Sequence, residues 1–536
     1  MRGNGKGFAK FEMGENCSVN EQAGMATDPK AATTFPQLIR AAAAAYGDDT
    51  AIVLRNEGEP EDSATFAQLD SRSARIARGL IARGIGKGSR VGFISGNGPN
   101  FAVLFAAIAR IGAVAVPIST LIKGSELVRV LRQSDIGGLI LQRRFLGYDY
   151  VERVCEALPE LRECGPALRI ARAPYLRWIL SSGDDLPASI GAFDSLAADA
   201  DQVNEDLLRE IEAEVHPTDQ LIEIYTSGSM ALPKGVKHLH GPAMFRTHFL
   251  REAIGPVRGK ESNAMLPMFW VGGLMMYLLP NWEVGALTVC SDRTLSNSRM
   301  AMGSVLPAED LQLLSNAPKP WWGLGMSETL GPYSWGDDFR AEGYPVCAPM
   351  DHFAPGYDVR IANEDNQPVG NGEIGELQIR GYPVTPALHK IERADYFTTD
   401  GYFHTGDMCR IEDRPEGRRI HFVGRGGDMI KSASSNVSPA EVEMEMQSLD
   451  GVHSAYVVGL PDVERGQVVV AAVVPREGVT LDFAEIEAQL RRNLSGFKVP
   501  RFFVEFARED VPMLHSNKVA RREIAALLAK RLGREA

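Results

Sequence analysis

A loop rich in hydroxyl groups and glycine lies at residues 225–236, where the chain reads Y-T-S-G-S-M-A-L-P-K-G-V. Small residues let backbone N–H groups approach an anion, hydroxyls add donors, and the ammonium of Lys234 offsets negative charge. The composition suits the phosphates of a nucleotide, although it is also typical of an ordinary surface turn. The Walker spacing G-x-x-x-x-G-K-[ST] is absent, so a Walker lysine loop is excluded.

The elements that position this loop can be predicted from the apolar pattern. The stretch 221–225 is apolar and β-branched, which predicts a buried strand leading into the loop. Upstream, apolar side chains recur at helical spacing between Leu69 and Ile81, and a short strand pattern follows at 91–95. The run 101–116 indicates a buried helix that leads into a strand. This alternation, which continues through the first 290 residues, predicts a parallel sheet covered by helices.

The pattern changes near residue 355. Short strand-like runs at 357–361 and 375–379 are separated by Gly, Asn and Asp turns, which indicates a compact β subdomain, and a mixed α/β pattern returns after Gly424. We therefore expect an α/β protein with a flexible extension at 1–30, a large region at 31–424 and a smaller domain at 425–536. The β subdomain is expected at about 355–424.

The composition argues against several classes of function. The net charge of −12 argues against a nucleic-acid partner, because no basic field is available to neutralise phosphates. No run approaches the roughly 18 apolar residues of a membrane span. The six cysteines have neither metal-site spacing nor a disulfide framework, which is typical of buried thiols in a reduced cytoplasm.

The loop T-S-G-S-M-A-L-P-K-G closely resembles the phosphate loop of the adenylate-forming enzymes, which include acyl-CoA synthetases and aryl-CoA ligases. The resemblance continues from about residue 35 to about residue 525, with further motifs in the family's order. The family usually has Thr-Thr-Gly where this chain has Ser229-Met230-Ala231. The resemblance implies that ATP phosphates are bound by a set of loop residues: Thr226, Ser227, Gly228, Ser229 and Lys234.

Three more motifs complete the nucleotide site that the resemblance implies. The run 323–329, G-L-G-M-S-E-T, is similar to a family element in which Gly325 and Met326 flank the nucleotide, Ser327 contacts the α-phosphate and Glu328 holds Mg²⁺. The family's adenine-packing tyrosine is Leu324 here. The remaining implied contacts are Asp407 of a Thr-Gly-Asp motif with the ribose, Arg425 with the ribose or a phosphate, and Gly303 with Ser304 along the adenine.

The resemblance also assigns roles in the smaller domain. Lys518 lies where relatives carry the lysine that stabilises charge as the carboxylate attacks the α-phosphate. Lys431 lies in a segment that faces the site during thioester formation. Gly427 falls at the hinge about which the small domain rotates, although two glycines beside charged residues are also compatible with a plain linker.

The acyl pocket is less well defined by the sequence. The run 266–274 resembles the element that carries an aromatic gate, with Trp270 where His is common and with Gly272 and Gly273 after it; Trp270 is equally compatible with a core residue. Only 17 residues separate Gly285 from Gly303, whereas relatives place strand–helix units of the pocket wall there. Either the pocket is rebuilt and open, or a deletion has damaged the enzyme.

The resemblance implies an AMP-forming ligase that uses ATP, Mg²⁺ and CoA to activate a fatty or other hydrophobic acid. One alternative is transfer of the acyl group to a carrier-protein thiol. Another is a degenerate relative that binds a nucleotide or acyl group without catalysis.

Overall fold

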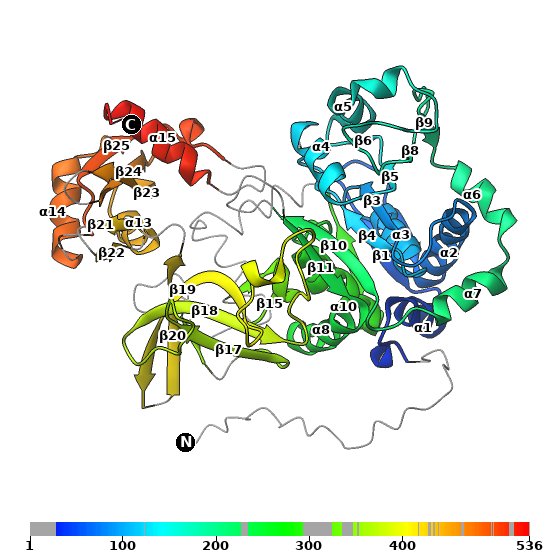
Figure 1. Cartoon of the computed structure of the whole chain (residues 1–536), viewed down its shortest axis with the longest axis horizontal. Coiled ribbons are helices and arrows are strands. Elements are labelled where there is room, and N and C mark those ends of the chain that lie inside the picture. The colour runs from blue at the N-terminus through cyan, green and yellow to red at the C-terminus, as the bar shows by residue number, and fades with distance from the viewer. Residues whose placement is uncertain are drawn as a thin grey trace.

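The computed structural model describes residues 28–122, 124–226, 234–292, 324–334, 347–350, 353–415, 417–426, 430–432, 435–437, 439–462, 466–494, 496, 498–513 and 519–534. These residues form two sheets in the N-terminal region, an antiparallel sheet in the middle of the chain and a mixed sheet near the C-terminus (Figure 1). The expected α/β class is therefore confirmed.

The largest sheet has seven strands in the order β11-β10-β4-β3-β5-β8-β9. Neighbouring strands in this sheet are parallel, except that β10 and β11 are antiparallel to each other. The strands are β3 (Arg90–Ile94), β4 (Val114–Pro117), β5 (Gly138–Leu141), β8 (Trp178–Ser181), β9 (Ile190–Ala192), β10 (Gln220–Thr226) and β11 (Lys234–Leu239). Helices cover both faces, as the alternating sequence pattern predicts.

One face of this sheet packs on α2 (Phe66–Ala82) and α3 (Pro99–Ala109), and the other on α4 (Gly124–Gln133) and α5 (Tyr150–Ala157). The Thr65 hydroxyl caps α2 by accepting a 3.2 Å hydrogen bond from the Gln68 backbone N–H. Every residue of α3 except Asn100 is buried, which confirms the prediction of a buried helix leading into a strand. Two short helices, α6 (Ser195–Asp199) and α7 (Glu205–Ala213), lie beside α2.

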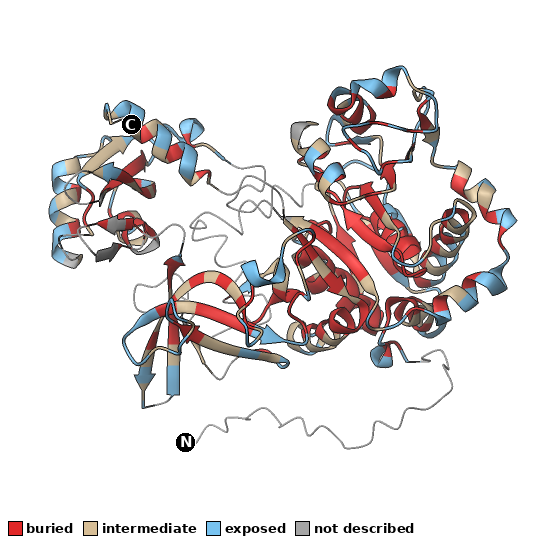
Figure 2. Ribbon diagram, in the orientation of Figure 1, coloured by how far each residue is buried: buried red, intermediate tan, exposed pale blue. Residues whose placement is uncertain are grey.

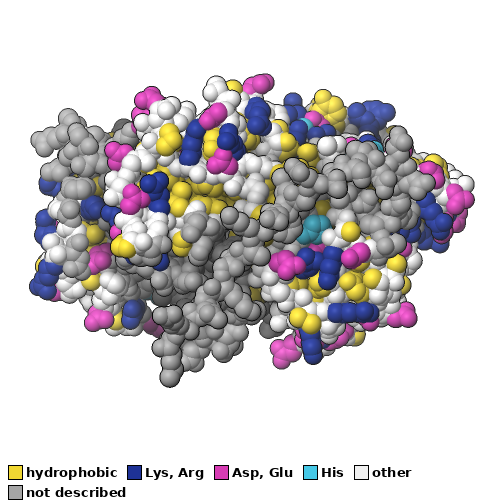
Figure 3. Space-filling model, turned by 90° about the horizontal axis from the view of Figure 1, so that it is seen from below, with side chains coloured by type: hydrophobic (Ala, Val, Ile, Leu, Met, Phe, Trp, Pro, Cys, Tyr) yellow, Lys and Arg dark blue, Asp and Glu magenta, His cyan; other side chains and the backbone are white. Residues whose placement is uncertain are grey.

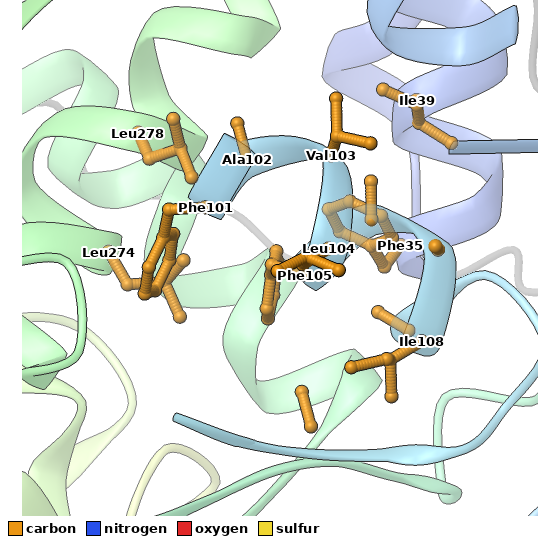
Figure 4. Close-up of a cluster of buried hydrophobic side chains, with 14 of the residues drawn as sticks. Phe35, Ile39, Phe101, Ala102, Val103, Leu104, Phe105, Ile108, Leu274 and Leu278 are labelled. Carbon is orange, nitrogen blue, oxygen red and sulfur yellow. The ribbon is translucent and has the colours of Figure 1, made fainter. Parts of the chain in front are cut away.

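A second sheet has the order β12-β13-β1-β2, with strands β1 (Thr50–Leu54), β2 (Asp62–Thr65), β12 (Glu261–Asn263) and β13 (Leu287–Cys290). The other helices of the N-terminal region are α1 (Phe35–Tyr46), α8 (His240–Ile254), which contacts β10 and β11, α9 (Val271–Gly273) and α10 (Leu279–Val284). Aromatic side chains join this unit to α3. Phe35 packs edge-on against Phe105 with ring centroids 5.0 Å apart, and Phe101 of the same helix lies beside Leu274 and Leu278 (Figure 4). The two N-terminal units therefore share one hydrophobic core (Figure 2).

The antiparallel sheet has the order β16-β20-β19-β18-β17. Its strands are β16 (Cys347–Pro349), β17 (Tyr357–Ala362), β18 (Ile374–Gly381), β19 (Phe403–Arg414) and β20 (Gly417–Arg425). The strand patterns seen in the sequence at 357–361 and 375–379 correspond to β17 and β18. The sheet also includes β16, which lies before residue 355, and Gly424 and Arg425 belong to β20 rather than to a linker.

The C-terminal unit is a mixed sheet with helices on both faces. Its strands are β21 (Ile430–Ser432), β22 (Ser435–Val437), β23 (Val452–Asp462), β24 (Gly466–Pro475) and β25 (Phe502–Glu505). One face packs on α13 (Pro439–Gln447) and α14 (Phe483–Asn493), and the other on α15 (Arg521–Arg531). This unit has its own two apolar clusters.

In the parts of the chain listed above, no helix is long and apolar enough to cross a bilayer. Among the cysteines whose side chains the structure describes, Cys155, Cys164, Cys290 and Cys409 form no disulfide, and three of these four are buried. On the surface in Figure 3, basic and acidic side chains are interspersed.

Candidate active site

The predicted phosphate loop connects two paired strands. The strands β10 and β11 are antiparallel, with Thr226 opposite Lys234, so the two ends of the loop are held side by side. Leu221 and Ile224 are buried, which confirms the strand predicted before the loop. The loop residues Ser227, Gly228 and Ser229 lie outside the described residues.

The side chain of Lys234 contacts an aromatic ring from the middle of the chain. Its Nζ lies 4.5 Å from the ring centroid of Tyr396, at a distance typical of a cation–π contact. The loop lysine is therefore next to the segment that leads into β19.

A tight hairpin carries the next group of predicted residues. It consists of β14 (Gly325–Met326), a short 3₁₀ turn (Ser327–Thr329) and β15 (Gly331–Pro332). A Cβ on Gly325 would lie 2.7 Å from the Pro332 Cα, so only glycine allows this close approach. Leu330 has a φ of 53°, which reverses the chain immediately after the turn.

Two hydrogen bonds attach this turn to neighbouring elements. The ring Nε2–H of His238 on β11 donates to the Ser327 carbonyl over 2.7 Å, and the backbone N–H of Thr385 donates to the Glu328 carbonyl over 2.7 Å. Burial lowers the pKa of His238 to about 4, so the ring is neutral at pH 7. The structure thus places Ser327 and Glu328 beside the strand that leaves the phosphate loop.

The predicted ribose contacts face each other across two strands. Asp407 on β19 is paired in register with Arg425 on β20, and the Arg425 Nε lies 2.9 Å from the Asp407 Oδ1. Arg425 Nη1 also donates to the Thr405 carbonyl over 2.7 Å. Gly406 has a φ of 72°, and its N–H donates to the Glu376 Oε1 over 2.8 Å. These contacts fix the backbone around Asp407.

The Asp407 carboxyl is only 5% exposed, and its environment disfavours the charged form. Burial raises the pKa of Asp407 to about 6; the Arg425 guanidinium opposes this rise, and the negative charges of Glu328 and Glu376 add to it. Glu328 and Asp407 are therefore near enough to interact electrostatically. A bound cation or hydrogen-bond donor at this point would relieve their mutual repulsion.

The two glycines after the predicted acyl gate, Trp270, lie in close contact with the residues just before it. A Cβ on Gly273 would lie 2.1 Å from the Pro267 carbonyl oxygen, so this position requires glycine. A Cβ on Gly272 would meet the Leu266 side chain at 2.6 Å. Trp270 is half-buried and packs edge-on against Phe269, with ring centroids 5.6 Å apart.

Asn97 is a residue of this site that the sequence did not reveal. Its side-chain amide donates to the Leu266 carbonyl over 3.1 Å and accepts from the Met268 N–H over 2.7 Å. Asn97 is 7% exposed, so it attaches the gate segment to the turn after β3 from inside the protein. The residues G-N-G-P at 96–99 are typical of a turn, but nothing local indicates the partner of Asn97, which is 171 residues away.

Several predicted residues cannot be placed. Gly303, Ser304, Gly427 and Lys518 lie outside the described residues. Lys431 is in β21, where it is paired in register with Asn436, and its side chain is outside the described part of the structure.

The shortened segment is described as far as residue 292. Its strand β13 lies between β12 and β1 and is parallel to both, so β13 is covered along both edges. The outcome for a pocket wall beyond residue 292 stays a prediction.

The structure places the buried carboxylate of Asp407 and its partner Arg425 near Glu328, on the turn beside the strand that leaves the predicted phosphate loop. Comparison with known families gives the particular class. The family model described as AMP-binding enzyme matches residues 39–319, and the model of the AMP-binding enzyme C-terminal domain matches residues 441–518.

Individual proteins agree with this match. A putative acyl-CoA synthetase of Bacillus subtilis is 26% identical over 91% of this chain and 95% of its own length, and a feruloyl-CoA synthase of Amycolatopsis is 28% identical over 86% and 93%. The solved structure of an anthranilate CoA ligase in complex with anthranoyl-AMP shares the fold, with a TM-score of 0.73 and 19% identity over 93% of this chain and 98% of that one. The chain belongs to the AMP-binding enzymes, within the adenylate-forming superfamily, and is an acyl-CoA-synthetase-like AMP-forming ligase.

Proposed function

We propose that the chain activates a carboxylic acid with ATP and transfers the acyl group to CoA. In the first step a carboxylate oxygen attacks the α-phosphorus of ATP, giving acyl-adenylate and pyrophosphate. In the second step the CoA thiolate attacks the acyl carbon and AMP leaves. The observation that carries this proposal is the convergence of Glu328, Asp407 and Arg425 beside the β10–β11 hairpin.

Each part of this arrangement has a role in the proposal. The phosphate-loop residues Thr226, Ser227, Gly228, Ser229 and Lys234 hold the phosphates, and Ser327 contacts the α-phosphate. Asp407 accepts hydrogen bonds from the ribose hydroxyls, and Arg425 keeps its carboxylate oriented. The adenine lies along Gly303, Ser304, Gly325 and Met326.

The carboxylate of Glu328 fits a magnesium ion that is also bound by ATP. Mg²⁺ prefers oxygen ligands and is usually held by one or two carboxylates together with phosphates, so no larger protein cage is needed. Glu328 raises the pKa of Asp407 through its negative charge, which supports an acidic environment for a cation here. When bound, the ion would neutralise charge on the phosphates.

The proposed acid is a fatty or other hydrophobic acid. The gate segment supports this, because its residues Pro267, Phe269 and Trp270 are apolar. The relatives named above are a putative acyl-CoA synthetase, a feruloyl-CoA synthase and an anthranilate CoA ligase, and the buried side chain of Asn97 holds the gate segment in place.

We also propose that the two regions move relative to each other. Residues 1–30 are an extension, 31–424 carry adenylation with a β subdomain at about 355–424, and 425–536 rotate about Gly427. Closure in one arrangement brings in Lys518 for adenylation, and in the other Lys431 for thioester formation. The reaction requires ATP and reduced thiols, so the cytoplasm is the proposed location.

Carboxylate-dependent exchange of labelled pyrophosphate into ATP tests the first step. Exchange with a hydrophobic acid is expected, followed by CoA-dependent release of AMP. A protein that binds ATP but gives no exchange with a broad panel of acids would be a degenerate relative. Exchange without turnover on CoA, but with turnover on a carrier-protein thiol, would assign the other acceptor.

A further inference from the structure

In the seven-stranded sheet, the direction in which successive strands are added reverses between β3 and β5. From β3 the chain passes through α3, on one face, to β4; from β5 it passes through α5, on the opposite face, to β8. The two connections therefore diverge outside the carboxyl ends of β3 and β5. In open parallel sheets, such a point is where ligands bind.

A cavity of about 260 Å³ lies at this point. Its rim includes Ser95, Gln142 and Ser182, which directly follow β3, β5 and β8. Its apolar wall comes from α2, α3, β5 and the loop after β9 and consists of Ile76, Val103, Leu104, Ile140, Leu141 and Phe193. The combination of an apolar wall with a few polar groups is typical of a small-molecule site.

Hydrogen bonds within the protein fix the rim of the cavity. The Gln142 Oε1 accepts from the Gly96 N–H over 3.0 Å and from the Ser95 hydroxyl over 3.2 Å. The Ser182 hydroxyl accepts from the Arg143 N–H over 3.1 Å. The side chains of the rim are thus held in place before a ligand binds, which lowers the free-energy cost of ordering them on binding.

The charge at the cavity is entirely positive. Arg72 and Arg75 of α2 line it, and none of the residues that line it is acidic. Arg72 donates to the Asn100 side chain over 3.4 Å, and Arg75 donates to the Ala197 carbonyl over 3.1 Å. Arg75 also lies 3.7 Å from Asp201, but both side chains are more than half exposed, so this ion pair is weak.

We propose that this cavity is a second ligand site, for an amphipathic organic anion. The anionic head lies between Arg72 and Arg75, and the apolar body packs against Ile76, Val103 and Leu104. The site is separate from the nucleotide site, because β4 lies between β3 and the β10–β11 hairpin. The proposal does not depend on the acid that the enzyme activates.

Fluorescence titration with 8-anilinonaphthalene-1-sulfonate, with AMP saturating in every sample, tests the cavity. The probe has an anionic head and an apolar body, and we expect saturable binding to the full chain. Ala197→Trp places a large side chain at the cavity and should weaken binding at least about tenfold. Ala198→Trp is the matched control, because the neighbouring side chain is exposed and does not line the cavity.

The charges are tested separately. Arg72→Ala combined with Arg75→Ala should weaken probe binding about tenfold, whereas Arg209→Ala, an exposed arginine on α7, should leave it unchanged. Octanoate should displace the probe and octylamine should not. The proposal is overturned if the wild type shows no saturable binding, if the arginine pair and Ala197→Trp bind the probe as the wild type does, or if octylamine displaces it as well as octanoate. Both arginines are on the surface, so their variants keep the test valid if the tryptophan variant does not fold.

Discussion

At the scale of single residues, the chemistry of this ligase depends on charges whose protonation the fold adjusts. Asp407 is buried between a cation and two anions, and His238 is buried where only a neutral ring is stable. In both cases desolvation is the largest cause of the pKa shift. The proposed ribose contact of Asp407 and the hydrogen bond from His238 to the Ser327 turn should therefore depend differently on pH.

Nucleoside affinity should fall as the pH drops through about 6, because Asp407 is protonated below its raised pKa and then accepts hydrogen bonds poorly. Calorimetric titration with adenosine measures this and avoids the titration of a phosphate. Asp407→Asn should weaken binding about tenfold or more at pH 7.5 and remove the pH dependence. A variant that keeps the dependence would show that another group causes it.

Lys518→Ala should abolish adenylate formation while presynthesised acyl-adenylate and CoA still give thioester, since the charge is needed only as pyrophosphate leaves. Pyrophosphate exchange and the second half-reaction are measured separately. Near-normal exchange in the variant would show that the lysine has another role.

At the scale of elements, the site is built where loops of three sheets meet. The hairpin β10–β11, the turn after β14 and the strand pair β19–β20 each contribute a part, and single hydrogen bonds such as His238 to Ser327 join them. Asn97 joins the turn after β3 to the gate segment in the same way. Buried contacts of this kind are costly to break because the remaining partners lose their hydrogen bonds.

Asn97→Ala should leave the Leu266 carbonyl and the Met268 N–H without their partner, at a cost of about 1–3 kcal/mol in unfolding free energy. We also expect a raised KM for the acid with little change in KM for ATP. Asn204→Ala is the control for stability, because it removes the cap of α7, where the side chain accepts from the Leu207 N–H over 2.8 Å. An equal effect of both variants on the acid KM would contradict a role for Asn97 at the gate.

At the scale of the whole molecule, the C-terminal unit has its own hydrophobic clusters and follows directly after β20. A unit with its own core can rotate without disrupting either domain. The N-terminal units, in contrast, share a core through α3 and are expected to move together.

Gly427→Pro should fix φ near −65° and restrict rotation of the C-terminal unit. Adenylation and thioester formation should then be reduced unequally, because they need different closures. Both half-reactions are measured on the same preparation, with circular dichroism as the check on folding. Equal losses in a folded protein would place the hinge elsewhere.

The short segment 285–303 predicts broad selectivity for chain length. If part of the pocket wall is missing there, each added CH₂ of the acid should contribute well below the roughly 0.8 kcal/mol of full burial. The measurement is kcat/KM across a series of linear acids. A sharply peaked dependence would indicate that other residues have rebuilt a closed wall.

The sequence by itself determined where helices and strands form and which residue types are available for chemistry. Apolar periodicity located α2, α3, β3, β17 and β18, and the order of short motifs gave the family, because both depend on residues close together in the chain. The glycines at 272–273 and 325 belonged to motifs already visible in the sequence.

Only the tertiary structure decided how these parts meet. Three features depend on contacts between segments that are distant in the chain. They are the register that sets Arg425 opposite Asp407, the contact of Asn97 with a segment 171 residues away, and the switch point beside Arg72. The pKa of Asp407 likewise depends on burial and on charges from three other segments. Such effects are sums over the packed environment, so no local pattern in the chain contains them.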